Sequence, residues 1–286
     1  MHCRTLMYRM LLRALAITAV PIVYAGTTHA VAQETKGEQS ILEKLGEDGG
    51  LFLEDAGSYF TAPLRFTGSD WLLTAGVAGG TVGLMAIDED MQELLGSENH
   101  ETLNDDFWDI PTSYGIVAYA NVFSLALYTG GLLSDSDDIR RTGRLMFESL
   151  SYSGITVMAL RYTFGRSRPY PGNSPWEFNW FETDNEIQSF PSGHTTVAFA
   201  MSTVLAEEIG GIWARIAFYG MASMTAYARV RNNQHWFSDV VVGAGLGLVS
   251  GLHVINRERE REGLADEARL TIVPMVNGIG IVYRLP

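Results

Sequence analysis

Two histidines in the C-terminal half of the sequence have neighbours that suit nucleophilic or acid–base chemistry. His235 precedes Asp239 by four residues, so on a helix the two side chains share a face. A carboxylate there can accept one ring N–H of the histidine and leave the other ring nitrogen free as a nucleophile or base. Taken alone, a solvated His–Asp pair at a helix start explains the spacing equally well.

The second histidine, His194, ends the segment Pro-Ser-Gly-His at 191–194, directly before an apolar run. Ser192 suits the N-cap position of a helix. Gly193 lets an anion approach the backbone N–H groups of the first turn, where negative charge is favoured. His194 would then lie beside any bound anion, whereas the alternative is a capped helix with an incidental histidine.

Three arginines accompany the histidines in the sequence. Arg161 and Arg168 are seven residues apart, which on a helix is about two turns along one face, and Pro169 is expected to end that helix. Arg229 stands just before a turn expected at 232–233. Guanidinium groups bind phosphate oxygens through paired hydrogen bonds. A basic helix end that complements its own dipole is the alternative for the first pair.

Together the three clusters resemble the type 2 phosphatidic acid phosphatase superfamily, which includes bacterial class A acid phosphatases and vanadium haloperoxidases. The signature of that family is Lys-x6-Arg-Pro, then Pro-Ser-Gly-His, then Ser-Arg-x5-His-x3-Asp, and the matching residues here run from Arg161 to Asp239. Arg161 stands where the family has lysine, and Ala228 stands where it has serine. Arginine keeps the positive charge, whereas Ala228 removes one hydroxyl contact.

The resemblance implies a metal-independent phosphomonoesterase without a cofactor, acting on a lipid phosphate such as phosphatidic acid or on a small phosphate ester. In the family's mechanism His235, oriented by Asp239, would attack phosphorus and form a phosphohistidine. His194 would protonate the leaving group and then activate water. The groups that would hold the phosphoryl oxygens are Arg161, Arg168, Arg229, Ser192 and the backbone N–H of Gly193.

Two other functions are compatible with the same residues. A vanadate-dependent haloperoxidase would bind vanadate where a phosphatase binds phosphate, although the familiar haloperoxidases are larger. A non-catalytic membrane or binding protein with the same fold is the other alternative. The presence of His194, His235 and Asp239 together argues against a loss of activity.

The apolar pattern predicts an all-α fold, a single bundle of about six helices over residues 51–262 with the active site at one end. The predicted helices are Trp71–Ile87, Tyr114–Leu133, Arg140–Thr163, Thr195–Ile209, Ile212–Arg229 and Asp239–Ile255. Residues 263–286 are expected to form a short β-hairpin around the turn signal Asn277-Gly278. Only the run from Tyr114 to Leu133 has a length that comfortably spans a bilayer.

The N-terminal residues and the net charge bear on location and partners. Arginines, an apolar run and the triplet at 30–32 predict an export signal peptide over residues 1–32, followed by a flexible lead-in over residues 33–50. The net charge of −13 argues against a nucleic-acid partner. A soluble or surface-attached periplasmic protein is favoured over an integral inner-membrane protein with its site facing the periplasm. Contact with a membrane surface is expected, and the oligomeric state is left open.

Overall fold

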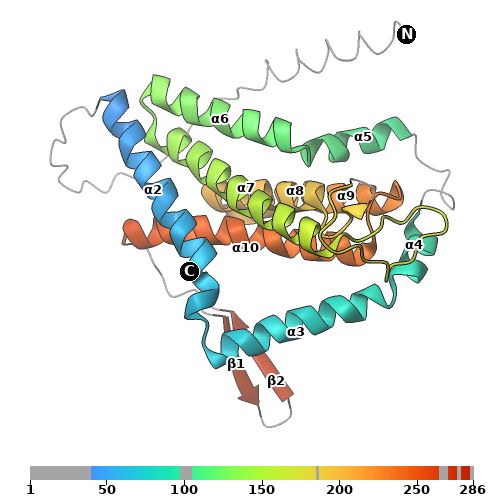
Figure 1. Cartoon of the computed structure of the whole chain (residues 1–286). Helices are drawn as coiled ribbons and strands as arrows, with labels where there is room; N and C mark the ends of the chain where they lie inside the picture. Colours follow the sequence, from blue (N-terminus) through green and yellow to red (C-terminus); the bar gives the residue numbers. More distant parts are fainter. Residues whose placement is uncertain (1–39, 97–104, 185–186, 264–269, 276–277, 284–286) are drawn as a thin grey trace, which may run out of the picture. The chain divides into compact units, whose positions relative to one another are not determined.

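The computed structural model describes residues 40–96, 105–184, 187–263, 270–275 and 278–283, and these residues are mostly helical (Figure 1). The predicted signal peptide lies outside the described residues. A 3-10 helix, η1 Ala62–Arg65, joins the first two α-helices. The α-helices in the described part of the chain are α2 Ile41–Thr61, α3 Gly68–Met85, α4 Asp88–Leu95, α5 Asp105–Tyr114, α6 Val117–Ser134, α7 Asp137–Phe164, α8 Gly193–Ile209, α9 Gly211–Arg231 and α10 Phe237–Arg261.

Helix α8 lies at the centre of the packing and contacts α7, α9 and α10 (Figure 1). Apart from His194, Glu207 and Glu208, its side chains are small or apolar, and most of them are buried. Helix α10 approaches α8 closely because a Cβ at Gly247 would lie 2.5 Å from the carbonyl oxygen of Thr196. Glycines recur every four residues in α10, at 243, 247 and 251. They also recur every four residues in α3, at 76 and 80 and at 79 and 83, yet no atom lies within 4 Å of the Cβ position at any of these four. The repeated glycine spacing therefore reflects close packing in α10 but not in α3.

Each of the six predicted helices corresponds to an observed helix, but α2, α4 and α5 were not predicted. Residues 41–50 belong to α2, although the sequence analysis expected a flexible lead-in there. The polar residues that suggested a linker are ion-pair partners of other helices. Lys44 bonds Asp135 at 2.6 Å, and Asp48 bonds Arg140 at 3.0 Å. Because Lys44, Asp48 and Arg140 are paired and largely buried, α2 is part of the packed structure.

Two helices, α6 and α10, are long and apolar enough to cross a membrane, and a third span is counted if α3 and α4, bent by 56° at their junction, cross as one. Helix α10 is longer than the predicted range Asp239–Ile255. Large apolar side chains on the surface of these helices include Trp71 on α3, Val122 on α6 and Val249 on α10. These features support the membrane-protein alternative over the soluble or surface-attached protein that the sequence analysis favoured.

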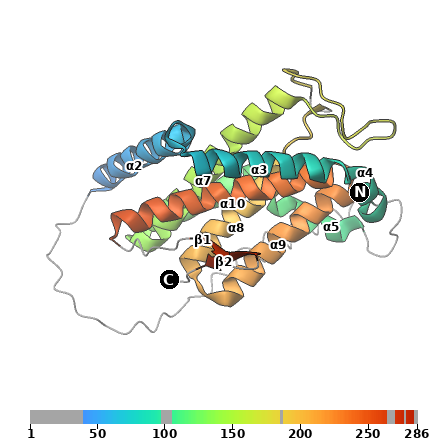
Figure 2. The ribbon, with the colours of Figure 1, turned by 90° about the horizontal axis from the view of Figure 1, so that it is seen from below.

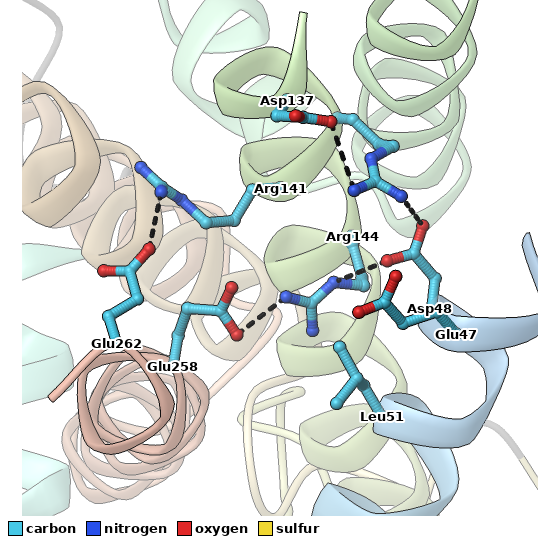
Figure 3. A pocket seen from close by; sticks show the side chains of 9 residues that line it. Glu47, Asp48, Leu51, Asp137, Arg141, Arg144, Glu258 and Glu262 are labelled. Atoms are coloured by element: carbon cyan, nitrogen blue, oxygen red, sulfur yellow. Dashed lines mark hydrogen bonds and ion pairs between the residues drawn. The ribbon is translucent and has the colours of Figure 1, made fainter. Parts of the chain in front are cut away.

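Charged residues from three helices line a pocket of about 200 Å³ between α2, α7 and α10 (Figure 3). Arg144 lies at its centre and bonds Asp48 at 3.3 Å, Glu148 at 3.0 Å and Glu258 at 2.7 Å. Arg141 contributes a further ion pair to Glu262, at 2.8 Å. These pairs join the first turns of α7 to the C-terminal turns of α10.

Near the C-terminus, strands β1 Leu270–Met275 and β2 Gly278–Tyr283 pair antiparallel, with Leu270 opposite Tyr283 and Met275 opposite Gly278. Residues 276–277, where the turn was predicted, lie outside the described residues. The hairpin over residues 263–286 therefore stays a prediction. The helices that carry the predicted site residues are α7 to α10, and Figure 2 shows α3 running alongside α10.

Candidate active site

The first cluster divides between a helix end and a loop. Helix α7 ends at Phe164, because Gly165 adopts a left-handed conformation (φ +51°) and its N–H bonds the carbonyl of Arg161 at 2.9 Å. A Cβ at Gly165 would lie 1.8 Å from the carbonyl oxygen of Asn179. The loop backbone at Asn179 can therefore pass this close to the end of α7 only because residue 165 is glycine. The expectation that Pro169 ends the helix is wrong. Arg161 lies in the last turn of α7, and Arg168 lies beyond it rather than on the same helix face.

The side chain of Arg161 connects the first cluster to the second cluster, the segment 191–194. Its Nε donates to the carbonyl of Pro191 at 3.0 Å. Its guanidinium also lies against Gly193, where a Cβ would be 3.1 Å from Nη2. Glycine at this position therefore gives the arginine, which is longer than the family's lysine, room to lie over the start of α8.

Arg168 and Arg229 are brought together by one residue that the sequence analysis did not single out, Gln234. Arg168 Nη1 donates to the Gln234 backbone carbonyl at 2.9 Å and to its side-chain Oε1 at 3.2 Å. Arg229 Nη2 lies 3.4 Å from the same Oε1. Arg229 is 8% exposed, and its Nε has no hydrogen-bond partner among the described residues. A buried donor of this kind favours an acceptor from a bound ligand.

The second cluster begins helix α8. Ser192 occupies the predicted N-cap position, but its side chain makes no capping bond, and its Oγ instead accepts from the Thr195 hydroxyl at 3.0 Å. The backbone N–H of Ser192 donates to the carbonyl of Asp239 at 3.0 Å. His194 lies in the first turn of α8, so this contact between backbones holds the second cluster against the third.

His235 lies in the turn between α9 and α10 and is 1% exposed. Its Nδ1 is 2.7 Å from the carbonyl oxygen of Ser189, whereas the nearer carboxylate oxygen of Asp239 is 3.8 Å away. The predicted hydrogen bond from the ring N–H to the Asp239 carboxylate is therefore replaced by one to a backbone carbonyl. A carbonyl can only accept, so this bond places the proton on Nδ1 and leaves Nε2 with a lone pair.

Asp239 acts on His235 through Ser189. Its Oδ2 accepts from the Ser189 hydroxyl at 2.5 Å and from the Trp236 backbone N–H at 2.9 Å. These bonds hold the residues whose backbone orients the imidazole. The sequence spacing brought His235 and Asp239 together correctly, but the intermediate serine, 46 residues before the histidine, had no recognisable signal.

A fully buried ion-pair network holds the carboxylate of Asp239 in place. Arg166 bonds Asp239 Oδ1 at 2.5 Å and Asp88 Oδ2 at 2.7 Å. Asp88 in turn accepts from the backbone N–H and the hydroxyl of Ser238, at 2.8 and 2.6 Å. Arg166, which lies between Arg161 and Arg168 in the first cluster, therefore takes part in ion pairs. Asp88 was missed because it lies in an acidic stretch without a distinctive spacing.

Burial and positive charge lower the pKa of both histidines. Burial, followed by Arg229, Arg161 and Arg168, lowers the pKa of His194 to about 4. Burial, then Arg161, lowers the pKa of His235 to about 3, against the opposing effect of Asp239. Both rings are therefore neutral at pH 7. Neither Arg161 nor Arg229 has a carboxylate partner in the described residues, so this group of cations and neutral imidazoles favours an anionic ligand.

Comparisons with known proteins give one family model and several similar proteins. The family model described as "PAP2 superfamily" matches residues 143–262, which contain all three clusters. The chain is 38% identical over 104 residues to a lipid A 1-phosphatase of Porphyromonas gingivalis, a match over 36% of this chain and 20% of that protein. It is 30% identical over 107 residues to a lipid A 1-phosphatase of Rhizobium etli, over 37% of this chain and 45% of that protein. The chain thus matches less than half the length of these relatives.

Two solved structures are also similar. One is LpxE of Aquifex aeolicus, with 22% identity, a TM-score of 0.46, and coverage of 58% of this chain and 93% of that one. The other is a transmembrane PAP2-type phosphatidylglycerolphosphate phosphatase of Bacillus subtilis, with 17% identity, a TM-score of 0.47, and coverage of 75% and 96%.

Proposed function

We propose, from the match of residues 143–262 to the family model described as "PAP2 superfamily", that the protein is a phosphatase that hydrolyses a lipid phosphomonoester. The observation that carries the proposal is the hydrogen bond from His235 Nδ1 to the carbonyl of Ser189, at 2.7 Å. It leaves Nε2 unprotonated on a buried imidazole whose pKa is lowered in part by Arg161 and Arg168. A nucleophile is thus held beside the cations that would bind its target.

In the first step, Nε2 of His235 attacks phosphorus, and the bond from phosphorus to the leaving oxygen breaks. Arg161, Arg168 and Arg229 stabilise the charge on the phosphoryl oxygens during this transfer. His194 gives its proton to the leaving alkoxide. Its pKa of about 4 in the unliganded site rises when the negatively charged ester binds, so the imidazole is protonated when that proton is needed.

In the second step, the alcohol leaves and a water molecule attacks the phosphohistidine. His194, now neutral, accepts a proton from that water. The bond between Nε2 and phosphorus breaks, and inorganic phosphate leaves. Asp239 and Ser189 hold the His235 ring in one orientation throughout. None of these steps uses a metal ion, in keeping with the expectation that no cofactor is required.

The substrate is proposed to be a phosphate monoester carried on a lipid. Two observations support this choice over a soluble ester. The similar proteins from Porphyromonas gingivalis and Rhizobium etli are named for a phosphate of lipid A. Helices α6 and α10 have the length and composition of membrane spans. We infer an integral membrane protein, and the periplasmic side is proposed from the export signal predicted for residues 1–32.

The test is phosphate release by the full chain, purified in detergent, with EDTA in excess. The substrates are dispersed phosphatidic acid and a soluble aryl phosphate. His235→Asn is the main variant, because its amide can still donate to the Ser189 carbonyl and so preserve the fold. We expect a loss of at least about a thousandfold, since removing the nucleophile removes the covalent route. Unchanged activity in His235→Asn would refute the assignment.

His253→Gln is the matched control, because His253 lies on α10 with its Nε2 3.3 Å from the carbonyl of Asp55, outside the predicted site. Its activity is expected to equal that of the wild type. Rapid acid-free quenching of the reaction with a phosphorus-32 ester should label the wild type with an alkali-stable, acid-labile phosphate. The label should be absent from His235→Asn. Turnover without any such label would contradict the phosphohistidine step.

A further inference from the structure

The loop between α7 and α8 exposes large aromatic side chains on a backbone that is held in place. Trp176, Trp180 and Phe181 are 50%, 56% and 61% exposed. The loop backbone is fixed between Trp176 and Trp180, by bonds from Ser167 N to the Glu177 carbonyl at 3.0 Å and from Asn179 N to the Gly165 carbonyl at 2.8 Å. The exposure of these rings is therefore a property of an ordered loop.

One of these residues adopts a costly conformation. Phe181 has a positive φ of +64°, which is rare and unfavourable for a bulky side chain. Its ring lies 5.8 Å from that of Tyr162, in the last turns of α7. The backbone thus tolerates strain at a position where the ring gains little burial, which points to a use for the exposed ring.

The exposed apolar surface continues from the loop along α7. Ile155, Met158 and Tyr162 are exposed and follow a spacing of three and four residues, so they share one face of the helix. We call Tyr162, Trp176, Trp180 and Phe181 the aromatic lip. It adjoins Arg161 in the sequence, since Arg161 precedes Tyr162 on α7.

Ring packing connects the aromatic lip to the candidate active site. Trp180 packs on Phe164 at 5.3 Å, and Phe164 packs on Phe190 at 5.5 Å. Phe190 precedes Pro191, whose carbonyl accepts from Arg161. Two aromatic rings in succession, Phe164 and Phe190, therefore connect the lip to the backbone that holds the arginine.

Two candidate membrane spans, α6 and α10, begin at the same level. Helix α10 begins two residues after His235, and α6 begins two residues after Gly115, where a Cβ would lie 2.6 Å from the His194 carbonyl oxygen. The pair of α3 and α4 reaches the site at its bend rather than at an end, because Asp88 at the start of α4 bonds Ser238. If α6 and α10 cross a bilayer, the histidines lie where these two helices leave the hydrocarbon. Tryptophan and tyrosine are the side chains that concentrate in that zone.

We propose that the aromatic lip lies in the headgroup layer of a lipid bilayer and brings the phosphate of a bilayer-bound lipid to the arginines of the site. This inference rests on the proposed function and deepens it. The lip makes the enzyme act on phosphate esters presented at a membrane surface, while a small soluble ester reaches the same arginines without it.

The test compares two substrates in one preparation of the full chain in phosphatidylcholine vesicles. One is phosphatidic acid within the vesicles, and the other is a soluble aryl phosphate. The variant Trp176→Ser/Phe181→Gly removes two rings, and glycine at 181 also relieves the positive φ, so the loop should stay folded. We expect kcat/KM for phosphatidic acid to fall about tenfold or more, because interfacial aromatic rings supply much of the contact with lipid. Aryl phosphate hydrolysis should change by less than about twofold.

Trp213→Ser is the matched control, since Trp213 is 80% exposed in the first turn of α9, at the opposite end of that helix from Arg229. Both of its activities should equal those of the wild type. A double variant that keeps the wild-type ratio of the two activities, or loses both in proportion, would overturn the proposal.

Failure of the proposed function would look different, because the wild type itself would release phosphate from neither substrate. The lip is then tested by fluorescence in vesicles of phosphatidylcholine brominated near the headgroup. The difference between the wild type and Trp176→Phe isolates the emission of Trp176. Quenching of that emission supports the lip, and unquenched emission refutes it.

Discussion

At the scale of single residues, uncharged oxygen atoms that accept hydrogen bonds organise the site. The Ser189 carbonyl fixes the tautomer of His235, and the Pro191 carbonyl fixes Arg161. The side-chain amide oxygen of Gln234 accepts from Arg168 and from Arg229, and so positions two arginines at once. A neutral acceptor there holds the cations together without cancelling their charge.

The first prediction changes the charge of that shared acceptor. Gln234→Glu should raise the Kd for orthovanadate, a phosphate analogue, by about tenfold or more, because a carboxylate between the guanidiniums repels the anion. Gln234→Met has a similar length and no charge, and its Kd should stay within a few-fold of the wild type. Inhibition of aryl phosphate hydrolysis at pH 7 measures both constants. Equal affinity in Gln234→Glu and the wild type would show that the oxyanion binds elsewhere.

The second prediction concerns the proton on His194. Burial and three arginines lower its pKa to about 4 in the unliganded site, so the ring is neutral at pH 6.5. A bound anion favours the protonated ring and raises this pKa, so anion binding should take up a proton from solution. Titration calorimetry of vanadate in buffers with different ionisation enthalpies measures the uptake. His194→Gln should abolish it, and an uptake that persists in that variant would assign the proton to another group.

At the scale of elements, sequence periodicity located the apolar helices but not the polar ones. The helices around the clusters, α7 to α10, lie within a few residues of their predicted ranges. Helix α2 was missed because its charges are satisfied by residues such as Arg140, 92 positions away. The predicted end of α7 at Thr163 is one residue from the observed end at Phe164, but the residue that ends the helix is Gly165 and not Pro169. Long-range ion pairs and a single left-handed residue are both invisible to a periodic pattern.

The third prediction tests that helix end. Gly165→Ala places a Cβ 1.8 Å from the Asn179 carbonyl oxygen at a φ of +51°, so we expect a loss of at least about 2 kcal/mol of stability. Activity should fall as well, because the loop that follows carries Arg168. Gly154→Ala is the control within the same helix, since no atom lies within 4 Å of its Cβ. It should stabilise the protein by about 0.5–1 kcal/mol. Thermal unfolding in detergent compares the two variants, and equal melting temperatures would contradict the close approach.

At the scale of the whole helical unit, charge is concentrated at the two ends of the long helices. One end holds the histidines and arginines of the site. The other holds the pocket of Figure 3, where Arg144 is bonded to three carboxylates. Seventeen residues of α7 separate Arg144 from Arg161, a length of roughly 26 Å. The two ends are therefore far enough apart to be tested independently.

The fourth prediction separates stability from ligand binding on this basis. Arg144→Met leaves the fully buried Glu148 without its ion-pair partner and should cost about 3–5 kcal/mol of stability. Arg215→Met removes a half-exposed partner of Glu207 and should cost less than about 1 kcal/mol. The vanadate affinity of the folded fraction should be unchanged in both variants. A weakened affinity in Arg144→Met would mean that the far end of the molecule acts on the site.

The last prediction decides whether the apolar helices lie in lipid. Helix α6 has 18 residues, a length of roughly 27 Å that is close to the hydrocarbon thickness of a bilayer. Leu125, near its middle, and Leu133, near its end, are 45% and 83% exposed.

On a protein surface in water, arginine at either position is tolerated within about 0.5 kcal/mol. In a bilayer, arginine at the helix centre costs about 2.5–3.5 kcal/mol, whereas near the end its charge reaches the interface. Leu125→Arg should therefore lower the melting temperature and the amount of protein in the membrane fraction, and Leu133→Arg should change both little. Equal tolerance of the two substitutions would mean that this face of α6 lies in water, and would favour a soluble or surface-attached protein over an integral membrane protein.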